Sequence, residues 1–310
     1  MFKYSLDNKR YHTLNYFYKT NFGFKIKKIS LNGGFSCPNM DGTKGYGGCI
    51  YCSKSGSGEF AGNVTHSLVK QFYEVKEVMD RKWPNGKYIG YFQARSNTYA
   101  PLSILKEKYE AILSLPDVMG LAIATRCDCI SDEVLDYLGV LSKKYYIVVE
   151  LGLQSIWEET GKFINRGHTL FEFTSCVKRL RERGINVVVH LINGLPNETL
   201  DMMLESAKFL NTLDIQGVKF HTLMVLKDTP LEKLYNKGDI KILSKDEYID
   251  IVIRQLEVLD PKIVIHRIIS DADIDNLISP KWIVKKVSVM NDIDKEMVIR
   301  DTYQGKLFGK

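Results

Sequence analysis

Apolar residues recur along this chain with two spacings, which alternate from one segment to the next. Some segments have apolar residues in an unbroken run or at every second position, as in β-strands; in others they return every three or four residues, as on one face of an α-helix. The predicted strands span residues 24–31, 88–93, 120–125, 146–153, 186–192 and 218–225. The predicted helices span residues 68–82, 101–114, 131–144, 170–183, 198–210 and 245–259. This alternation predicts a parallel sheet with right-handed crossovers.

Polar clusters follow the C-terminal ends of these strands. They span residues 37–52, 93–98, 125–128, 150–155 and 194–198. A doubly wound sheet gathers its site at one switch point, whereas a barrel builds its site along this rim from several strands. We therefore expect a partial (β/α)6 TIM-like barrel over residues 24–260. A basic, aromatic N-terminal arm would precede it over residues 1–23, and a C-terminal extension over residues 261–310 would pack on it.

Charge changes this picture at the N-terminus. The 310-residue chain has a formal net charge of +6, and residues 1–30 alone hold seven Lys or Arg against one Asp, a difference of +6. The same thirty positions contain eight aromatic residues. Interleaved cations and rings suit RNA, whose phosphates and bases they contact. The alternative is a solvated basic arm whose aromatic rings pack on the barrel, and charge patterning does not decide between the two.

The apolar pattern contains no run of about eighteen uncharged apolar residues, and the N-terminal segment lacks the apolar stretch of a secretory signal. Three of the six cysteines lie in one loop, which is unlike the disulfide framework of a small secreted domain. We expect a cytoplasmic protein without membrane contact, whose clustered cysteines serve as ligands.

The clustered cysteines lie in a loop of residues 31–60 that is rich in Gly, Asn, Asp and Ser. Cys37, Cys49 and Cys52 are separated by eleven and then two residues. A closed zinc site takes four ligands, for which the sequence offers His66 or the pair of Cys127 and Cys129. A 4Fe-4S cluster held by only three thiolates leaves one iron open to a further ligand. The spacing alone allows either site.

The loop resembles the cysteine motif of the radical S-adenosylmethionine (radical SAM) enzymes, in the variant with eleven residues between the first two cysteines. Tyr51 matches the aromatic residue that this family places directly before the last cysteine. The resemblance continues along the chain to one subfamily, the MnmL-type (YtqA/YhcC-like) proteins related to the catalytic subunit of Elongator. The segments that carry it are, in order, GGFSCPNMDGTKGYGGCIYC, FQARSNTYAP, ATRCDC, VELGLQS, INRGH, INGLPNET, KFHTLMVLKDTPL, VIHR and TYQG.

This resemblance implies one 4Fe-4S cluster held by Cys37, Cys49 and Cys52, whose fourth iron is chelated by the amino and carboxylate groups of S-adenosylmethionine (SAM). In the family, one electron splits SAM to methionine and a 5′-deoxyadenosyl radical, which removes a hydrogen atom from an unactivated carbon. The three cysteines are therefore the expected catalytic centre. An electron donor of the flavodoxin or ferredoxin type is the expected redox partner.

The subfamily resemblance also implies a substrate. Relatives of this type act on the wobble uridine of tRNA and convert a carboxymethylaminomethyl group at carbon 5 towards aminomethyl or methylaminomethyl. Hydrogen abstraction next to the amine nitrogen would create a radical from which the carboxylated fragment can leave. The expected partner is then tRNA, and a SAM-dependent methyltransferase would act next in the pathway.

The resemblance assigns SAM contacts to polar residues at the rim. Ser96 and Asn97 would pair with the ammonium or carboxylate of SAM, or else cap an ordinary loop. Arg126 and Arg166 are candidate cations for the SAM carboxylate, or else solvated surface arginines. The other expected contacts are Tyr51, Gln93, Gln154 and Gly194, the last in a turn that resembles the adenine-flanking turn of the family.

Glu150 is a carboxylate within an apolar strand, where it is costly unless it is paired. We expect it to accept hydrogen bonds from the ribose hydroxyls or the ammonium of SAM; the alternative is a structural ion pair. The expected residues on the substrate side are His190, His221, His266 and Arg267, although a histidine after an apolar strand is often a hydrogen-bonded core residue. The remaining cysteines, Cys127, Cys129 and Cys176, are expected to be reduced structural thiols.

Two alternatives stay open. The first is a radical SAM enzyme that acts on a small metabolite or a porphyrin, which would have no affinity for tRNA. The second is a non-enzymatic RNA-binding protein with a structural zinc site in the cysteine loop, which would be colourless after anaerobic purification. The hypothesis carried forward is a radical SAM enzyme that acts on the wobble uridine of tRNA.

Overall fold

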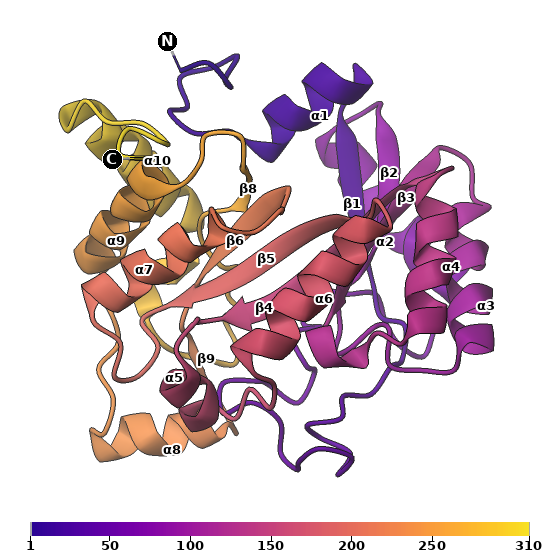
Figure 1. Ribbon diagram of the computed structural model, residues 1–310, viewed down its shortest axis with the longest axis horizontal. Helices are drawn as coiled ribbons and strands as arrows, with labels where there is room; N and C mark the ends of the chain where they lie inside the picture. The colour runs from indigo at the N-terminus through magenta and orange to yellow at the C-terminus, as the bar shows by residue number, and fades with distance from the viewer. Residues whose placement is uncertain (1, 310) are drawn as a thin grey trace.

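The computed structural model describes residues 2–309 and is built on a seven-stranded parallel sheet. The strands lie side by side in the order in which they occur along the chain, so each crossover returns to a neighbouring position. The sheet curls into a half-barrel that stays open between its first and last strands (Figure 1). Its strands are β1 (Ile26–Leu31), β2 (Lys87–Phe92), β3 (Val118–Thr125), β4 (Tyr146–Gln154), β5 (Asn186–Asn193), β6 (Gly217–Thr222) and β8 (Val264–Arg267).

The expected partial barrel is confirmed, with one strand more than the six predicted. β8 pairs with β6 and comes from the segment that we expected to be only an extension. The predicted strand over residues 218–225 divides into β6 and the two-residue β7 (Val225–Leu226), which pairs antiparallel with β9 (Leu277–Ser279). A strand of four residues such as β8 carries too little alternation to be recognised from its sequence.

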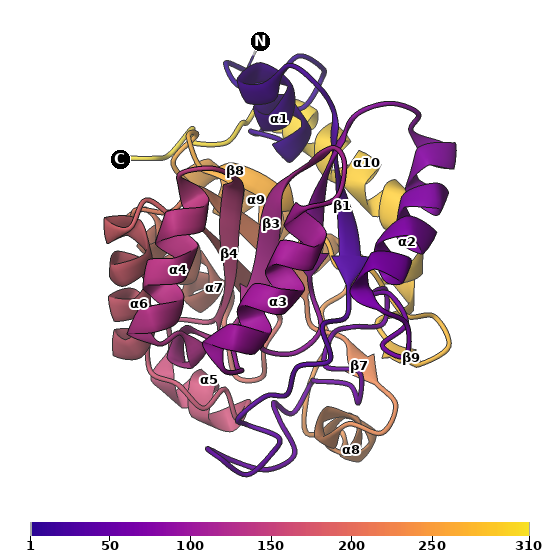
Figure 2. The ribbon, with the colours of Figure 1, turned by 90° about the vertical axis from the view of Figure 1, so that its right-hand side faces the viewer.

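Helices cover the outer face of the sheet, and Figure 2 shows α3, α4 and α6 side by side on it. Local signals start them: the hydroxyl of Ser131 accepts from the backbone N–H of Val134 at the start of α4, and Thr169 and Glu172 form a capping box at α6. The α-helices of residues 2–309 are α1 (Leu14–Phe22), α2 (Leu68–Lys82), α3 (Leu102–Leu113), α4 (Asp132–Ser142), α5 (Glu158–Phe163), α6 (Leu170–Glu182), α7 (Leu200–Leu210), α8 (Pro230–Lys237), α9 (Lys245–Val258) and α10 (Lys286–Ile299).

Alternation along the strands divides the core into two parts. The outward residues, among them Ile29, Leu121 and Val149, form the main core with the helices. The inward residues fill the barrel interior in layers. The lowest layer is apolar and consists of Ile26, Ile89, Ala122, Val148 and Val188.

The next inward positions on β1, β4 and β5 are charged or polar. Two residues beyond Ile26, Val148 and Val188 come Lys28, Glu150 and His190. These side chains contact one another across the interior. The interior of the barrel therefore changes from apolar to charged within two residues along these strands.

The N-terminal arm closes the apolar end of the barrel. α1 packs Phe17, Tyr18 and Phe22 against the lowest layer, and Tyr18 is only 3% exposed. Thr13 forms a parallel bridge to Ile265 at the free edge of β8. Figures 1 and 2 both place α1 at the opposite end of the sheet from the loop that follows β1. These contacts are those of the packing alternative, and four of the eight aromatic residues that suggested RNA stacking, Phe17, Tyr18, Phe22 and Phe24, pack at the closed end of the barrel.

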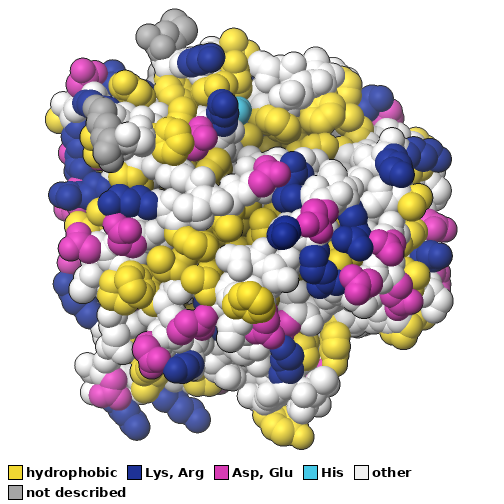
Figure 3. Space-filling view, viewed as in Figure 1, with side chains coloured by type: hydrophobic (Ala, Val, Ile, Leu, Met, Phe, Trp, Pro, Cys, Tyr) yellow, Lys and Arg dark blue, Asp and Glu magenta, His cyan; other side chains and the backbone are white. Residues whose placement is uncertain are grey.

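The C-terminal residues hold this arrangement together. The side chain of Gln304 accepts from the backbone N–H of His12 at 2.8 Å and donates to the carbonyls of Asp260 and Ile263. The face in Figure 3 carries charged side chains of both signs among apolar ones. Within residues 2–309, no helix is both long enough and apolar enough to cross a membrane.

Replacing Tyr18 with alanine should lower the free energy of unfolding by about 3–5 kcal/mol, because it removes a buried ring between α1 and the lowest layer. Tyr18→Phe is the matched control. The Tyr18 hydroxyl is buried without a hydrogen-bond partner among the described residues, so its removal should be neutral or stabilising. Urea unfolding measures both variants, and a Tyr18→Ala loss below about 1 kcal/mol would contradict this role of α1.

Candidate functional site

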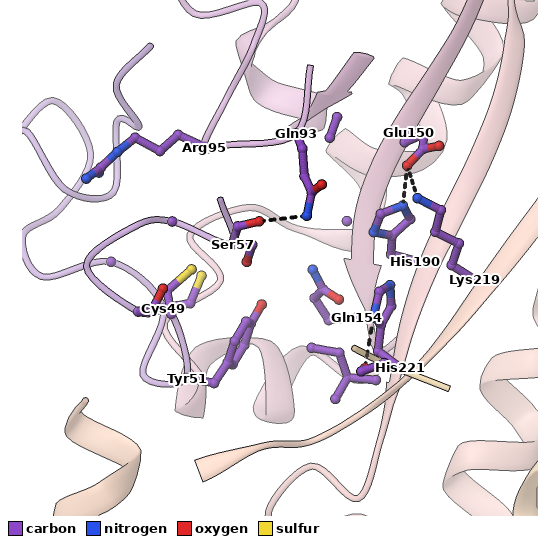
Figure 4. Close-up of a pocket in the computed structure, with 18 of the residues that line it drawn as sticks. Cys49, Tyr51, Ser57, Gln93, Arg95, Glu150, Gln154, His190, Lys219 and His221 are labelled. Atoms are coloured by element: carbon purple, nitrogen blue, oxygen red, sulfur yellow. Dashed lines mark hydrogen bonds and ion pairs between the residues drawn. The ribbon is translucent and has the colours of Figure 1, made fainter. Parts of the chain in front are cut away.

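A cavity of about 270 Å³ opens among the C-terminal ends of the strands. Cys37, Cys49 and Cys52 line one end of it, from the loop that follows β1. Figure 4 shows Cys49 and Tyr51 at this end, Gln154 in the middle, and a group of charged side chains at the other end. The predicted rim site is therefore a single cavity with two chemically different ends.

Backbone contacts shape the cysteine loop. The carbonyl of Cys37 accepts from the N–H groups of Met40 and Asp41, and the carbonyl of Cys49 accepts from the N–H of Cys52 at 2.9 Å. Gly48 has a φ of +75°, a left-handed conformation that favours glycine, directly before Cys49. These tight turns direct the three thiols towards one end of the cavity.

All three thiols are free. Burial raises the pKa of both Cys49 and Cys52, so binding of iron would release their protons. Among residues 2–309, no group of three or more His, Cys, Asp or Glu side chains has the spacing of a single-ion site. A 4Fe-4S cluster is wider than one ion and takes its thiolates around its corners. Three free thiols along one end of a cavity fit such a cluster.

The fourth ligands considered for zinc lie elsewhere. His66 contacts Glu74 at 2.9 Å near the surface. Cys127 and Cys129 are buried on a short 3-10 helix, and neither lines the cavity. Cys176 is buried in the main core. The latter three match the expected structural thiols. The charge of Cys37 helps to raise the pKa of Cys129, so these two thiols are near each other, but Cys129 does not line the cavity with the loop cysteines.

Most of the residues expected to contact SAM line the cavity, but two do not. Asn97 is fully buried, and its amide donates to the carbonyl of Ala124 at 2.7 Å, as in the loop-capping alternative. Gly194 lines a second cavity, where it faces Leu243. The expected roles of Asn97 and Gly194 therefore have no support in the geometry. The expected residues that line the main cavity are Tyr51, Gln93, Ser96, Arg126, Glu150, Gln154 and Arg166.

Both candidate arginines already have protein partners. Arg126 donates to both carboxylate oxygens of Asp128 at 2.9 Å and to the carbonyl of Arg166 at 2.7 Å. Arg166 is 2% exposed and donates to the carbonyls of Leu153, Ser155 and His168. Neither is the solvated surface residue of the alternative. Both line the cavity, and most of their donors already join the loops of the rim, so a contact with SAM stays a prediction.

Glu150 lies at the charged end and is 1% exposed. Its Oε1 accepts from Lys28 at 2.7 Å, and its Oε2 accepts from His190 at 3.0 Å and from Lys219. Burial alone would raise the pKa of Glu150, but the two lysines hold it well below its usual range. These contacts are those of the ion-pair alternative, and the expectation of a carboxylate free for SAM needs this correction.

Lys219 is a site residue that the sequence analysis missed. It is 5% exposed in the middle of β6, donates to the hydroxyl of Tyr91 at 3.1 Å, and lines the cavity. Burial lowers its pKa to about 7 despite the opposing effect of Glu150. A lysine inside a strand that is otherwise apolar was the signal that could have revealed it.

Three of the four residues expected on the substrate side line the cavity, namely His190, His221 and Arg267. Burial and the charge of Lys219 lower the pKa of His190 to about 4, so its ring is neutral at pH 7. His266 does not line the cavity; its ring lies against Gly217, so its expected pocket role is not supported. Further lining residues that the sequence analysis missed are Ser57, Arg95, Ser270 and Asp271.

Comparison with known proteins explains this combination of fold and cysteines. Residues 44–210 match the family model of the radical SAM superfamily, a range that includes Cys49 and Cys52, and residues 215–298 match the radical SAM C-terminal domain. The uncharacterized protein YtqA of Bacillus subtilis is 50% identical over 307 residues, which cover 99% of this chain and 95% of YtqA.

More distant similarities agree. Elongator complex protein 3 of Saccharomyces cerevisiae is 31% identical over 52% of this chain and 30% of its own length. The solved structure of the archaeal Methanocaldococcus infernus Elp3 with an N-terminal deletion superposes with a TM-score of 0.68 at 16% identity, covering 90% of this chain and 64% of that one. The expected resemblance is thus confirmed, and this chain belongs to the radical SAM superfamily, in the subfamily of YtqA that is related to Elongator complex protein 3.

Proposed function

We propose that this protein binds one 4Fe-4S cluster and SAM, and abstracts hydrogen from the carbon-5 side chain of a tRNA wobble uridine. The observation that carries the proposal is the cavity itself. Three free thiols line one of its ends, and charged side chains that can recognise a polar substrate line the other. A structural zinc site has four protein ligands and binds no substrate, so it would not require a cavity beside the cysteines.

The chain divides the work between the two ends. Cys37, Cys49 and Cys52 would hold the cluster, and SAM would lie between them and the amides of Gln93 and Gln154. When bound, the cluster and SAM supply a 5′-deoxyadenosyl radical after one-electron reduction. The side chain of Gln93 is held by its hydrogen bond to the carbonyl of Ser57 at 2.9 Å, so it offers a fixed polar contact (Figure 4).

The tRNA substrate rests on the subfamily resemblance and on the shape of the rim. The cysteine loop carries the exposed rings of Tyr46 and Phe60, which are 81% and 51% exposed. Phe60 and Arg95 both line the cavity. Exposed rings are suited to stacking an unpaired base, and a cation near one of them can contact its phosphate. We therefore place the RNA contact at this rim, with the N-terminal arm at the far end of the barrel.

The proposal extends to the pathway. A donor of the flavodoxin or ferredoxin type would reduce the cluster, and a SAM-dependent methyltransferase would act on the aminomethyl product. A cytoplasmic location agrees with reduced cysteines throughout the chain.

Cys49→Ala should lose most of its iron and sulfide after anaerobic reconstitution and should form no 5′-deoxyadenosine from SAM, because two thiolates cannot retain the cluster. Cys176→Ala is the matched control, since it removes a thiol from the main core and should keep both properties. Iron analysis and product chromatography give the readouts. Wild-type rates of 5′-deoxyadenosine formation by Cys49→Ala, or a colourless zinc-loaded wild type, would refute the cluster.

Cells that lack this protein should accumulate carboxymethylaminomethyl groups on wobble uridine and lose the aminomethyl or methylaminomethyl forms. Mass spectrometry of digested tRNA measures both nucleosides. The wild-type gene should restore the normal pattern, and the Cys49→Ala gene should not. Unchanged nucleosides in the deletion strain would remove tRNA as the substrate and leave the small-metabolite alternative.

A further inference from the structure

We infer that the charged end of the cavity is an anion-binding subsite, in which Lys219, Arg267 and His221 bind the carboxylate of the substrate side chain. This inference rests on the proposed function and deepens it, because it names the group of the substrate that the enzyme recognises.

Strand register brings these residues together. In the parallel pairing of β5, β6 and β8, His190 is opposite Lys219, and Lys219 is opposite Arg267. Paired residues of neighbouring strands point to the same face, so these side chains form one row inside the barrel. His221 lies two positions beyond Lys219 and therefore on the same face, nearer to the rim. All four residues line the cavity.

The row lies apart from the cysteines. In Figure 4, His190 and Lys219 lie beside Glu150 at one side of the cavity, and Cys49 lies at the other, with Gln93 and Gln154 between them. A SAM molecule held at the cysteine end would therefore leave the Lys219 row for a second molecule.

Positive charge exceeds negative charge in this row. Lys28 and Lys219 share the carboxylate of Glu150, two cations on one anion, which leaves a net charge of +1 when Lys219 is protonated. Arg267 and Lys286 share the carboxylate of Asp271 in the same way. The carboxylate of Asp273, which accepts from Asn276, offsets part of this excess. An excess of cations in a cavity that is partly shielded from water favours an incoming anion.

The same residues have donors to spare. The ammonium of Lys219 has three hydrogens, of which Glu150 and the hydroxyl of Tyr91 take two. The recorded partner of the Arg267 guanidinium among the described residues is Asp271, at 2.8 Å, so several of its five N–H donors stay available. A carboxylate can accept from both groups at once.

His221 supplies a third donor. Its Nε2 is buried and has no hydrogen-bond partner among residues 2–309. Its Nδ1 lies 3.2 Å from Oγ of Ser270, which accepts from the backbone N–H of Thr222 at 3.0 Å. The Ser270 hydroxyl is then free to donate to Nδ1, which places the ring proton on Nε2. Nε2 of His221 is therefore a hydrogen-bond donor that a ligand in the cavity could satisfy.

The proposed substrate carries a matching acceptor. The carboxymethylaminomethyl group ends in a carboxylate. Two methylenes lie next to its amine nitrogen, and one of them is bonded directly to that carboxylate. Holding the carboxylate in the Lys219 row would fix this methylene in the space that faces the cysteine end. Such positioning is what a hydrogen transfer between two bound molecules requires.

The test uses the reconstituted full-length enzyme with SAM, a reductant and two synthetic anticodon stem-loops. One RNA carries carboxymethylaminomethyl on its wobble uridine, and the other carries the neutral carboxamide of the same group. Wild type should process the acid RNA with a kcat/KM about 10- to 100-fold higher, because charge-assisted hydrogen bonds are lost with the amide. The phosphates of the two RNAs are identical, so the ratio isolates the side-chain carboxylate.

Arg267→Gln should reduce this preference to within about threefold, through a higher KM for the acid RNA. His221→Phe, which keeps a ring of similar shape, should reduce the preference in the same direction. Arg181→Gln, on the outer surface of α6, is the control and should leave the preference intact. Equal kcat/KM for the two RNAs in wild type, or a preference untouched by both site variants, would overturn the subsite.

Failure of the proposed function would look different. In that case 5′-deoxyadenosine forms but neither RNA is converted, and filter binding then tests the subsite alone. Tighter binding of the acid RNA than of the amide RNA, lost in Arg267→Gln, would support the subsite without the reaction. Equal binding would overturn it.

The preference should also depend on pH. The groups that face Lys219 are Glu150 on β4, Lys28 on β1, Tyr91 on β2, His190 on β5 and Arg267 on β8. His221 on β6, His266 on β8 and Asp271, which follows β8, also lie near enough to interact with its charge. Because the pKa of Lys219 is about 7, its ammonium loses its proton above that pH, and an anion then gains less from the site. The ratio of kcat/KM for the acid and amide RNAs should fall from about pH 7 upwards, by at most tenfold per pH unit. A ratio that stays constant to about pH 9 would exclude Lys219 from the subsite.

Discussion

One buried carboxylate organises the interior of this barrel. Glu150 accepts from Lys28 on β1, His190 on β5 and Lys219 on β6, so a single anion joins widely separated strands of the half-barrel. Removing one partner of such a buried pair typically costs about 3–5 kcal/mol, because the remaining charge is left uncompensated. The network also marks a boundary: below it the interior is apolar and closed by α1, and above it the interior is polar and open to the rim.

Elements that depend on local sequence could be predicted, whereas elements that depend on distant contacts could not. The helix predicted over residues 68–82 has the bounds of α2, because a long amphipathic pattern with a stop signal is local information. The six-residue α5 and the four-residue β8 lack such a pattern, and their positions depend on contacts made elsewhere. The aromatic N-terminal arm shows the same dependence on distant contacts. The spacing of its rings suits both packing on the barrel and stacking on RNA, and only the fold shows that α1 covers the apolar end of the barrel.

The site divides in a similar way. The three cysteines are recognisable because their chemistry depends on residue type and spacing within one loop. The partners of Glu150 are not, because Lys28 lies 122 residues away in sequence, and a pairing of this range follows from the fold. The same limit applies to Arg166 and Asn97, which were expected to contact SAM. Their side chains donate to the carbonyls of Leu153 and Ala124, and such contacts cannot be read from the sequence. In the fold, these two side chains stabilise the loops around the cavity through hydrogen bonds to the backbone.

The proposed reaction requires a cavity with a cluster at one end and a substrate carboxylate at the other. The most direct measurement is a crystal structure of the anaerobically reconstituted enzyme with SAM and an anticodon stem-loop that carries carboxymethylaminomethyl on its wobble uridine. The account predicts a 4Fe-4S cluster on Cys37, Cys49 and Cys52, and the carboxylate within hydrogen-bond distance of Lys219 and Arg267. A metal held by four protein ligands, or a uridine side chain bound outside this cavity, would contradict it.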